Sequence, residues 1–175
     1  SPPPRSAPLY LSAGSGVYKG QGLGGPFNLG AILRTAAAYR VEHLYLAAMQ
    51  IDPTSTNVGK TALGADRFVP WTMHDDLASA IAAARLAGYS IVGLELADQA
   101  VPIHDADLPS PMCFIIGHED RGLSKSALTE CDSVVFLPQL GRIGSLNVAT
   151  ARPLYTSDAA DETTAKNPGT IPTLK

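Results

Sequence analysis

The chain has 175 residues, of which 45% are hydrophobic and 17% charged, and its formal net charge is −3. This length suits one domain with a sizeable core, and the normal apolar content with a small net charge excludes disorder over the whole chain. The two cysteines, Cys113 and Cys131, exclude a disulfide scaffold and indicate reduced thiols in a cytoplasmic protein. The longest candidate membrane span, Ala78–Leu96, is interrupted by charged residues, so none is predicted. The mild acidity argues against indiscriminate nucleic-acid binding but allows a local basic face.

The composition divides the chain into three regions. Residues 1–7 contain three consecutive prolines and are expected to form an extended leader, while residues 8–151 are expected to form one domain. From Arg152 the sequence becomes polar and loses all periodicity, and Leu154–Glu162 (LYTSDAADE) resembles a translated sequencing adapter. We therefore expect residues 152–175 to be a non-native tail in place of the true C-terminus; a natural disordered tail is the alternative.

Short apolar runs alternate with helical patterns between residues 8 and 138. Five runs rich in branched or aromatic residues, each bounded by turn formers, are predicted strands: Pro8–Ser12, His43–Ala48, Ser90–Leu96, Met112–Gly117 and Ser133–Pro138. Their nearly continuous apolar character is typical of a parallel sheet covered on both faces.

Three helices are predicted between these strands. Asn28 is expected to cap a helix that ends near Tyr39, and Asp75–Asp76 are expected to begin a second helix that ends near Gly88. The apolar stripe of the second helix comprises Leu77, Ile81, Ala84 and Leu86. A third helix is expected around Lys125–Glu130. The alternation predicts an α/β fold, a mostly parallel sheet flanked by helices, with ligands at the carboxyl ends of its strands.

Some glycine-containing segments match nucleotide-binding motifs only in part. Gly20, Gly22 and Gly25 satisfy G-x-G-x-x-G, and Glu42 stands where a ribose-binding acid would be. The fingerprint requires its first glycine directly after a strand, whereas several residues intervene here. Asn57–Thr61 (NVGKT) lacks the opening glycine of a phosphate loop. A nicotinamide or flavin site is therefore the weaker hypothesis.

No metal site or hydrolase elbow is predicted. The histidines His43, His74, His104 and His118 lie far apart in the sequence, and none pairs with another His or a Cys at ligand spacing. A G-x-S-x-G nucleophile motif is also missing from the sequence.

Two segments place charged residues beside glycines or in apolar surroundings. Asn28–Thr35 (NLGAILRT) carries one arginine, Arg34, in an otherwise apolar helix, and a surface arginine with a buried stem is the ordinary interpretation. Phe114–Ser124 (FIIGHEDRGLS) is a strand that ends in Gly117, followed by a charged loop with a second glycine. Such a loop lets a ligand approach the backbone closely. The alternative interpretation is a simple connection between a strand and a helix without a ligand.

A third segment completes the pattern. Phe136–Ala149 (FLPQLGRIGSLNVA) is a glycine-punctuated loop that leads into a helix beginning at Ser145. Together, the three segments resemble the motifs of the TrmH/SpoU family of RNA 2′-O-ribose methyltransferases, of the SPOUT class: N-x-x-(A/S)-x-x-R, a strand ending G-x-E-x-x-G-(L/I/M), and P-x-x-G…S-L-N-V-(A/S). Lys60–Trp71 is also similar to one bacterial branch, and the resemblance extends over about Pro8–Ala151.

The resemblance implies transfer of a methyl group from S-adenosylmethionine to a ribose 2′-hydroxyl of tRNA or rRNA. Displacement at a sulfonium needs positioning and help in deprotonating the hydroxyl, and it needs no metal. The donor is expected to lie against the two glycine-rich loops, with contacts from Gly117, Leu137 and Leu146.

The same motif matching makes Arg34 the expected catalytic residue. Because an arginine stays protonated, we expect it to hold a phosphate oxygen that helps to remove the hydroxyl proton, rather than to act as a strict general base. Asn28 is expected to position Arg34, Glu119 to orient it through an ion pair, and Ser145 and Asn147 to shape the pocket for donor and hydroxyl.

A C-terminal trefoil knot and a homodimer, in which Arg34 can serve the partner's donor pocket, are further implications of the resemblance. The helix that follows the third motif in the family is replaced here from Arg152 onward, so an incomplete knot and weak dimerisation are compatible with the sequence. A catalytically silent RNA-binding fragment of the same family is the main alternative function, and a nicotinamide-dependent oxidoreductase is the weaker one. Candidate cations for RNA contact, each also explained as an ordinary surface residue, are Lys19, Arg40, Lys60, Arg67, Arg121 and Arg142.

Overall fold

The fold is built on a seven-stranded sheet in which every pairing is parallel. The computed structural model describes residues 9–12, 25–117 and 122–138. The strand order is β3-β2-β1-β6-β4-β7-β5. The strands are β1 (Leu9–Ser12), β2 (Leu44–Ala47), β3 (Trp71–His74), β4 (Ser90–Leu94), β5 (Val101–Pro102), β6 (Met112–Ile116) and β7 (Ser133–Phe136). The expected α/β fold with a parallel sheet is confirmed.

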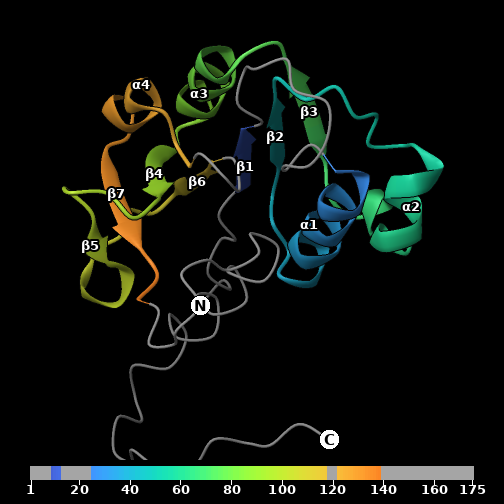
Figure 1. Ribbon diagram of the computed structural model, residues 1–175, viewed down its shortest axis with the longest axis horizontal. Coiled ribbons are helices and arrows are strands. Elements are labelled where there is room, and N and C mark those ends of the chain that lie inside the picture. Colours follow the sequence, from blue (N-terminus) through green and yellow to red (C-terminus); the bar gives the residue numbers. More distant parts are fainter. Residues whose placement is uncertain (1–8, 13–24, 118–121, 139–175) are drawn as a thin grey trace, which may run out of the picture.

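Helices cover both faces of the sheet (Figure 1). The α-helices are α1 (Pro26–Ala38), α2 (Thr56–Ala62), α3 (Leu77–Leu86) and α4 (Lys125–Thr129), and two short 3₁₀ helices are η1 (Ala65–Arg67) and η2 (Ile103–Asp105). Leu44 and Leu46 of β2 join the apolar cluster under α1 and α2, whereas Tyr45 and Ala47 join the cluster under α3. Successive strand side chains point to opposite faces, so a strand buried on both sides is apolar throughout.

All five expected strands are present, and two further strands escaped prediction. β3 escaped because its side chains are half-buried or exposed, and Thr72 and His74 break the apolar run. β5 has only two residues, which is too short for any periodicity. Both are the outermost strands of the sheet, where burial constrains the sequence least.

Helix α1 begins before the expected cap, so the assignment of Asn28 as N-cap is wrong. Gly25 is the N-cap residue and Pro26 occupies the first helical turn. The backbone nitrogens of Asn28 and Leu29 both donate to the Gly25 carbonyl oxygen, at 3.1 and 3.2 Å. Proline suits the start of a helix because its ring fixes φ near the helical value. The N–H that it lacks would have no intrahelical partner there. This places Asn28 inside the first turn.

Helix α3 follows the prediction except at its last residue. The Asp76 carboxylate accepts a hydrogen bond from the Ser79 backbone nitrogen at 2.7 Å, which confirms the cap. Leu86 was expected in the buried stripe, but its side chain is 92% exposed, because its position is out of phase with Ile81 and Ala84. Gly88 follows the C-cap with φ +88°, as expected for the left-handed end of a helix.

Helix α2 includes the segment that resembled part of a phosphate loop. It packs on α1, and a Cβ added at Gly30 would lie only 2.6 Å from the Val58 carbonyl oxygen and 2.7 Å from the Thr61 Cβ. Gly30 is therefore required for the close approach of the two helices. Neither α2 nor any other helix in the described ranges has the length and apolarity needed to cross a membrane.

Candidate active site

Three neighbouring strands end together and define a candidate site at the carboxyl edge of the sheet. Leu94, the last residue of β4, is in register with Ile116 of β6 on one side and Val135 of β7 on the other. Gly117 directly follows β6 and is buried, and Leu137 follows β7 and is half-buried. The structure thus places these two residues, both expected to contact a donor, on either side of the end of β4.

Gly117 occupies a position at the end of β6 that only glycine can fill. A Cβ added there would collide with the carbonyl group of Gly122 and with the backbone nitrogen of Leu123. Gly122 itself has φ +63°, in the left-handed region that favours glycine. Gly122 and Leu123 therefore lie directly against the end of β6, and we call this close approach the Gly117 turn.

Glu95 holds this turn from the neighbouring strand, and the sequence analysis did not identify it. Its Oε2 accepts a hydrogen bond from the Leu123 backbone nitrogen at 2.8 Å, and a Cβ at Gly122 would collide with the same carboxylate. Glu95 is fixed in turn, because its backbone nitrogen donates to the Val135 carbonyl oxygen at 2.9 Å. The available signal was an acid at the end of an apolar strand, but the expected strand Ser90–Leu96 included Glu95 within it.

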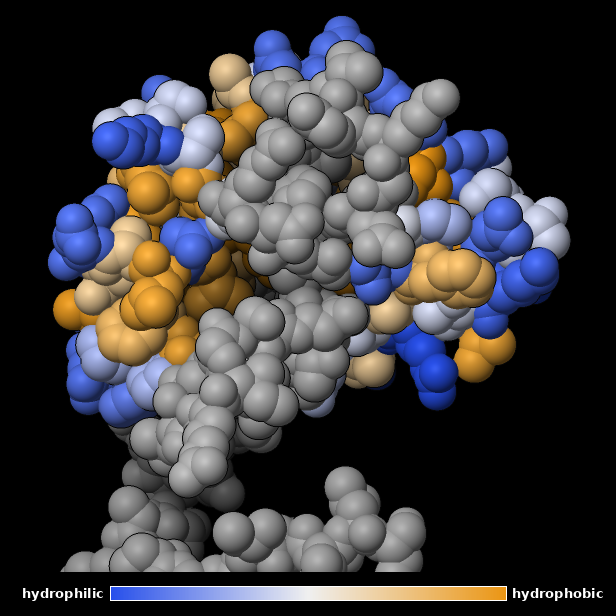
Figure 2. Space-filling view, in the orientation of Figure 1, coloured by the Kyte–Doolittle hydropathy of each residue, from blue (hydrophilic) through white to orange (hydrophobic). Residues whose placement is uncertain are grey.

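The surroundings of this edge are apolar. Buried Val92, Ile103 and Val135 form a cluster that includes partly buried Phe114 and Leu137. Figure 2 shows hydrophobic side chains reaching the surface on the side of β4, β5 and β7. An edge of this kind offers a ligand mainly backbone groups and apolar side chains.

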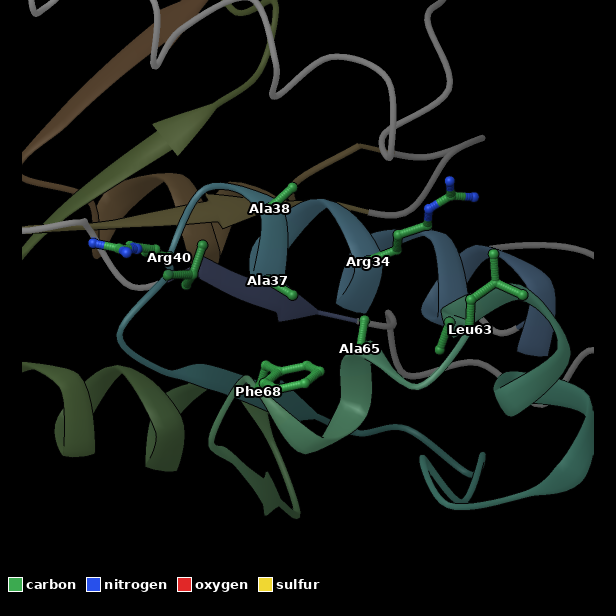
Figure 3. Close-up of a pocket in the computed structure, with 9 residues that line it drawn as sticks. Arg34, Ala37, Ala38, Arg40, Leu63, Ala65 and Phe68 are labelled. Atoms are coloured by element: carbon green, nitrogen blue, oxygen red, sulfur yellow. The ribbon is translucent and has the colours of Figure 1, made fainter.

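Arg34 lies on the exposed side of α1, next to a cavity. Ile32 and Leu33 are buried beneath α1, whereas Arg34 is exposed and lines a cavity of about 770 Å³ with residues of α2 and η1 (Figure 3). The described contacts do not join Arg34 to Gly117 or Leu137.

The other predicted site residues are placed only in part. Asn28 is half-buried in the first turn of α1 and stands six positions before Arg34, so the two side chains point roughly 120° apart around the helix. The remaining predicted residues, Glu119, Ser145, Leu146 and Asn147, lie outside the described residues.

Glu42 does not occupy the position that a dinucleotide site requires. Its carboxylate accepts a hydrogen bond from the Tyr89 hydroxyl, which raises the pKa of Tyr89 to about 12. Glu42 precedes β2 and so stands at the amino end of that strand, whereas a ribose-binding acid belongs at the carboxyl ends. This position argues against a nicotinamide site.

Two histidines that are distant in the sequence meet in the structure. Thr72 Oγ1 lies 2.9 Å from His43 Nε2 and 3.0 Å from His74 Nε2. Burial, and secondarily the charge of His74, lower the pKa of His43. No group of three or more His, Cys, Asp or Glu side chains that could hold a metal ion occurs within the described ranges.

A parallel α/β sheet with a glycine turn at its carboxyl edge defines a ligand-binding fold of the open-sheet class. The model of the SpoU rRNA Methylase family matches residues 21–156. The chain therefore belongs to this family, as the three motifs predicted.

Relatives and solved structures agree with this assignment. A Synechocystis protein named an uncharacterized tRNA/rRNA methyltransferase is 36% identical over 132 residues, which are 74% of this chain and 34% of its own length. The tRNA (guanosine(18)-2′-O)-methyltransferase of Escherichia coli K12 is 30% identical over 134 residues, 77% of this chain and 58% of its own length. The SpoU methyltransferase AviRb of Streptomyces viridochromogenes, solved in complex with the cofactor AdoMet, superposes with a TM-score of 0.69 at 25% identity, covering 85% of this chain and 56% of that chain. The chain thus spans about half of the length of most of these proteins.

Proposed function

We propose that this chain transfers a methyl group from S-adenosylmethionine to a ribose 2′-hydroxyl of tRNA or rRNA. The observation that carries the proposal is the Gly117 turn at the carboxyl edge, where Glu95 holds the backbone against the end of β6. The names of the relatives support the reaction, since the E. coli protein is a tRNA 2′-O-methyltransferase and AviRb was solved with AdoMet.

The residues at this edge fit the donor. The buried backbone around Gly117 and the apolar side chain of Leu137 offer an adenine ring the mixture of backbone and apolar contacts that such sites use. Leu146 is proposed to complete the pocket, with Ser145 and Asn147 beside the hydroxyl. The bound donor supplies an activated methyl group on a sulfonium, and no step asks for a metal ion.

Arg34 is proposed to act on the RNA rather than on the donor. Its guanidinium holds a phosphate oxygen next to the reacting ribose, and this oxygen accepts the proton of the 2′-hydroxyl while the hydroxyl oxygen bonds to the methyl carbon and the carbon–sulfur bond breaks. Asn28 and Glu119 are proposed to fix the position of Arg34. Because Arg34 is exposed on α1, apart from Gly117, we propose that the chain works as a homodimer in which Arg34 serves the partner's donor pocket.

The finer architectural expectations are also proposals. They comprise residues 8–151 as the methyltransferase domain, an extended leader at residues 1–7, a non-native or disordered tail at residues 152–175, a C-terminal trefoil knot and a cytoplasmic location. The carboxyl ends of β6 and β7, at which the second and third motifs lie, are on either side of β4.

Arg34→Ala tests the division of labour between donor site and arginine. Calorimetry with S-adenosylmethionine should give the wild-type dissociation constant, while methyl transfer to bulk tRNA and rRNA should fall by a factor of at least about 100, the usual contribution of proton-transfer assistance. Arg34→Lys keeps the charge but not the forked donor geometry and should recover only part of the rate. Full activity of Arg34→Ala contradicts the assignment, and a wild-type chain that binds RNA and donor without turnover supports the catalytically silent alternative.

A further inference from the structure

Apart from Arg34, the residues that line the cavity beside α1 have no role in the proposed chemistry. It lies between α1 and the α2–η1 segment and has a volume of about 770 Å³. In Figure 3, Arg34 and Arg40 stand at opposite ends of it, and Ala65 and Phe68 face Ala37 of α1 from the η1 side. We call this cavity the α1 groove.

Two large apolar side chains of the α1 groove remain in contact with water. Phe68 is 77% exposed and Leu63 is 68% exposed. An exposed aromatic ring next to arginines is the combination that proteins use to stack a nucleobase while holding its phosphate. The alanine floor beneath α1 leaves room for a flat ring.

Backbone strain is concentrated at the same place. Within the described residues, three that are not glycine have positive φ, and two of them, Arg40 (φ +51°) and Leu63 (φ +53°), line the α1 groove. Helices α1 and α3 end in the same hydrogen-bond pattern, with Arg40 and Gly88 in equivalent positions after the C-cap. Glycine adopts this backbone conformation without strain. At this position α3 has a glycine, whereas α1 has Arg40 and is therefore strained. Such strain is characteristic of functional sites.

The charges of the α1 groove favour an anionic ligand over a second copy of this chain. Within the described residues, Arg34 and Arg40 form no ion pair. None of the described residues that line the groove is acidic, and the nearby Asp66 is not among them. The whole chain has a net charge of −3, so this cationic groove departs from the average surface. Two copies that met through it about a two-fold axis would bring arginines together, which is unfavourable.

We propose that the α1 groove binds a nucleotide adjacent to the methylated one in a single-stranded RNA segment. Phe68 stacks on the base and Arg40 binds the phosphate, while Arg34 at the other end contacts the reacting nucleotide. Arg34 lies within α1 and Arg40 directly follows its C-cap residue Tyr39, so the two guanidinium groups stand at opposite ends of the groove (Figure 3). This inference rests on the proposed RNA substrate and adds how that substrate is held.

The test measures binding of a fluorescein-labelled single-stranded RNA by anisotropy, at several salt concentrations, together with donor affinity and the KM and kcat of RNA methylation. Phe68→Ala should weaken RNA binding roughly 5- to 150-fold, the range of one lost stacking contact, and raise KM with little change in kcat. Phe68→Tyr keeps a ring and should retain binding, whereas Phe68→Leu should lose it. Because Phe68 is exposed, none of these changes should impair folding.

Arg40→Gly provides a readout that a structural role would not give. Glycine relieves the positive φ, so the thermal midpoint of unfolding should rise, while RNA binding weakens and its logarithmic salt dependence falls by about one unit. Arg40→Lys should keep most of the salt dependence. Lys125→Ala, which removes an exposed cation from α4 on the other face of the sheet, should leave RNA affinity unchanged.

The outcomes separate this inference from the proposed function. Methylation by the wild type with unchanged KM and RNA affinity in Phe68→Ala and Arg40→Gly overturns the α1 groove alone. Methylation absent in the wild type overturns the proposed function, and the groove is then judged by RNA affinity only. A wild type that binds no RNA would overturn the inference. Variants that change only the oligomeric state, measured by sedimentation, would also overturn it and would indicate that the groove is a self-association surface.

Discussion

The carboxyl edge of β6, β4 and β7 and the α1 groove are built on different principles. At the edge, buried backbone sets the geometry: Gly117 fits because no Cβ does, and one carboxylate, Glu95, fixes the turn. In the α1 groove, exposed side chains set the binding properties: Arg40 has a strained positive φ, and Phe68 is exposed to solvent. Substitutions at the edge should therefore affect folding and donor binding together, whereas substitutions in the groove should weaken RNA binding and leave donor binding unchanged.

The largest effect is expected for Gly117→Ala. The added methyl group would overlap the backbone of Gly122 and Leu123, which cannot move without breaking the turn. We expect a loss of about 2–4 kcal/mol in the free energy of unfolding, measured by urea denaturation, and loss of donor binding in calorimetry.

Gly59→Ala is the matched control for that substitution. Gly59 is exposed in α2, and nothing lies within 4 Å of an added Cβ. Alanine should therefore stabilise the protein by about 0.5–1 kcal/mol through helix propensity. If Gly117→Ala behaves like Gly59→Ala, the turn is not the tight structure described here.

A smaller effect is expected for Glu95→Ala. Removing the carboxylate leaves the Leu123 backbone nitrogen without its acceptor, at a cost of about 1–3 kcal/mol for a partly buried group. The turn should loosen, so donor affinity should fall about tenfold while the KM for RNA stays nearly constant.

Glu95→Gln is the control, because its amide oxygen can still accept the hydrogen bond and should restore most of the donor affinity. If Glu95 only stabilises the fold, Glu95→Ala should lower the free energy of unfolding without this selective loss of donor binding. Equal loss of donor affinity in Gln and Ala variants would show that the charge, rather than the hydrogen bond, is what matters.

These elements differ in how far the sequence predicts them. β2 and β6 are predicted because burial on both faces makes the whole run apolar, and the Asp76 cap is predicted because its hydrogen bond is local. Gly117 could be singled out for the same reason: a strand end followed by glycine is a local pattern. The N-cap of α1 was misplaced by three residues, since both Asn28 and the pair Gly25–Pro26 are acceptable starts and only the structure distinguishes them.

Tertiary contacts account for what the sequence does not reveal. Glu95 contacts Leu123 across 28 residues of chain, and no periodicity encodes such a contact. The α1 groove joins α1 with Phe68 through the packing of α2 at Gly30, so its members have no common motif. Arg40 was recognisable as a cation in the sequence, but its positive φ is visible only in the folded chain.

The smallest effect concerns Asp132, which supports the same half of the sheet at its opposite, amino edge. Its carboxylate accepts hydrogen bonds from the Ile91 backbone nitrogen at 2.6 Å and from Arg85 at 3.0 Å. The backbone bond first, and Arg85 second, outweigh burial and lower the pKa of Asp132 below its usual value of 3.8. A carboxyl group whose pKa is lowered by folding adds stability above the unfolded pKa and loses it as the pH falls through the folded value.

Asp132→Asn should therefore lower the unfolding free energy by about 1 kcal/mol at pH 7, a modest figure because the side chain is 40% exposed. The difference between wild type and variant, measured by urea denaturation, should shrink as the pH falls below 4 and the wild-type carboxylate becomes protonated. Donor and RNA affinities at pH 7 should not change, because Asp132 belongs to neither the carboxyl edge nor the α1 groove. A pH-independent difference would mean that the ionised form of Asp132 is not what holds β4 and the start of β7 together.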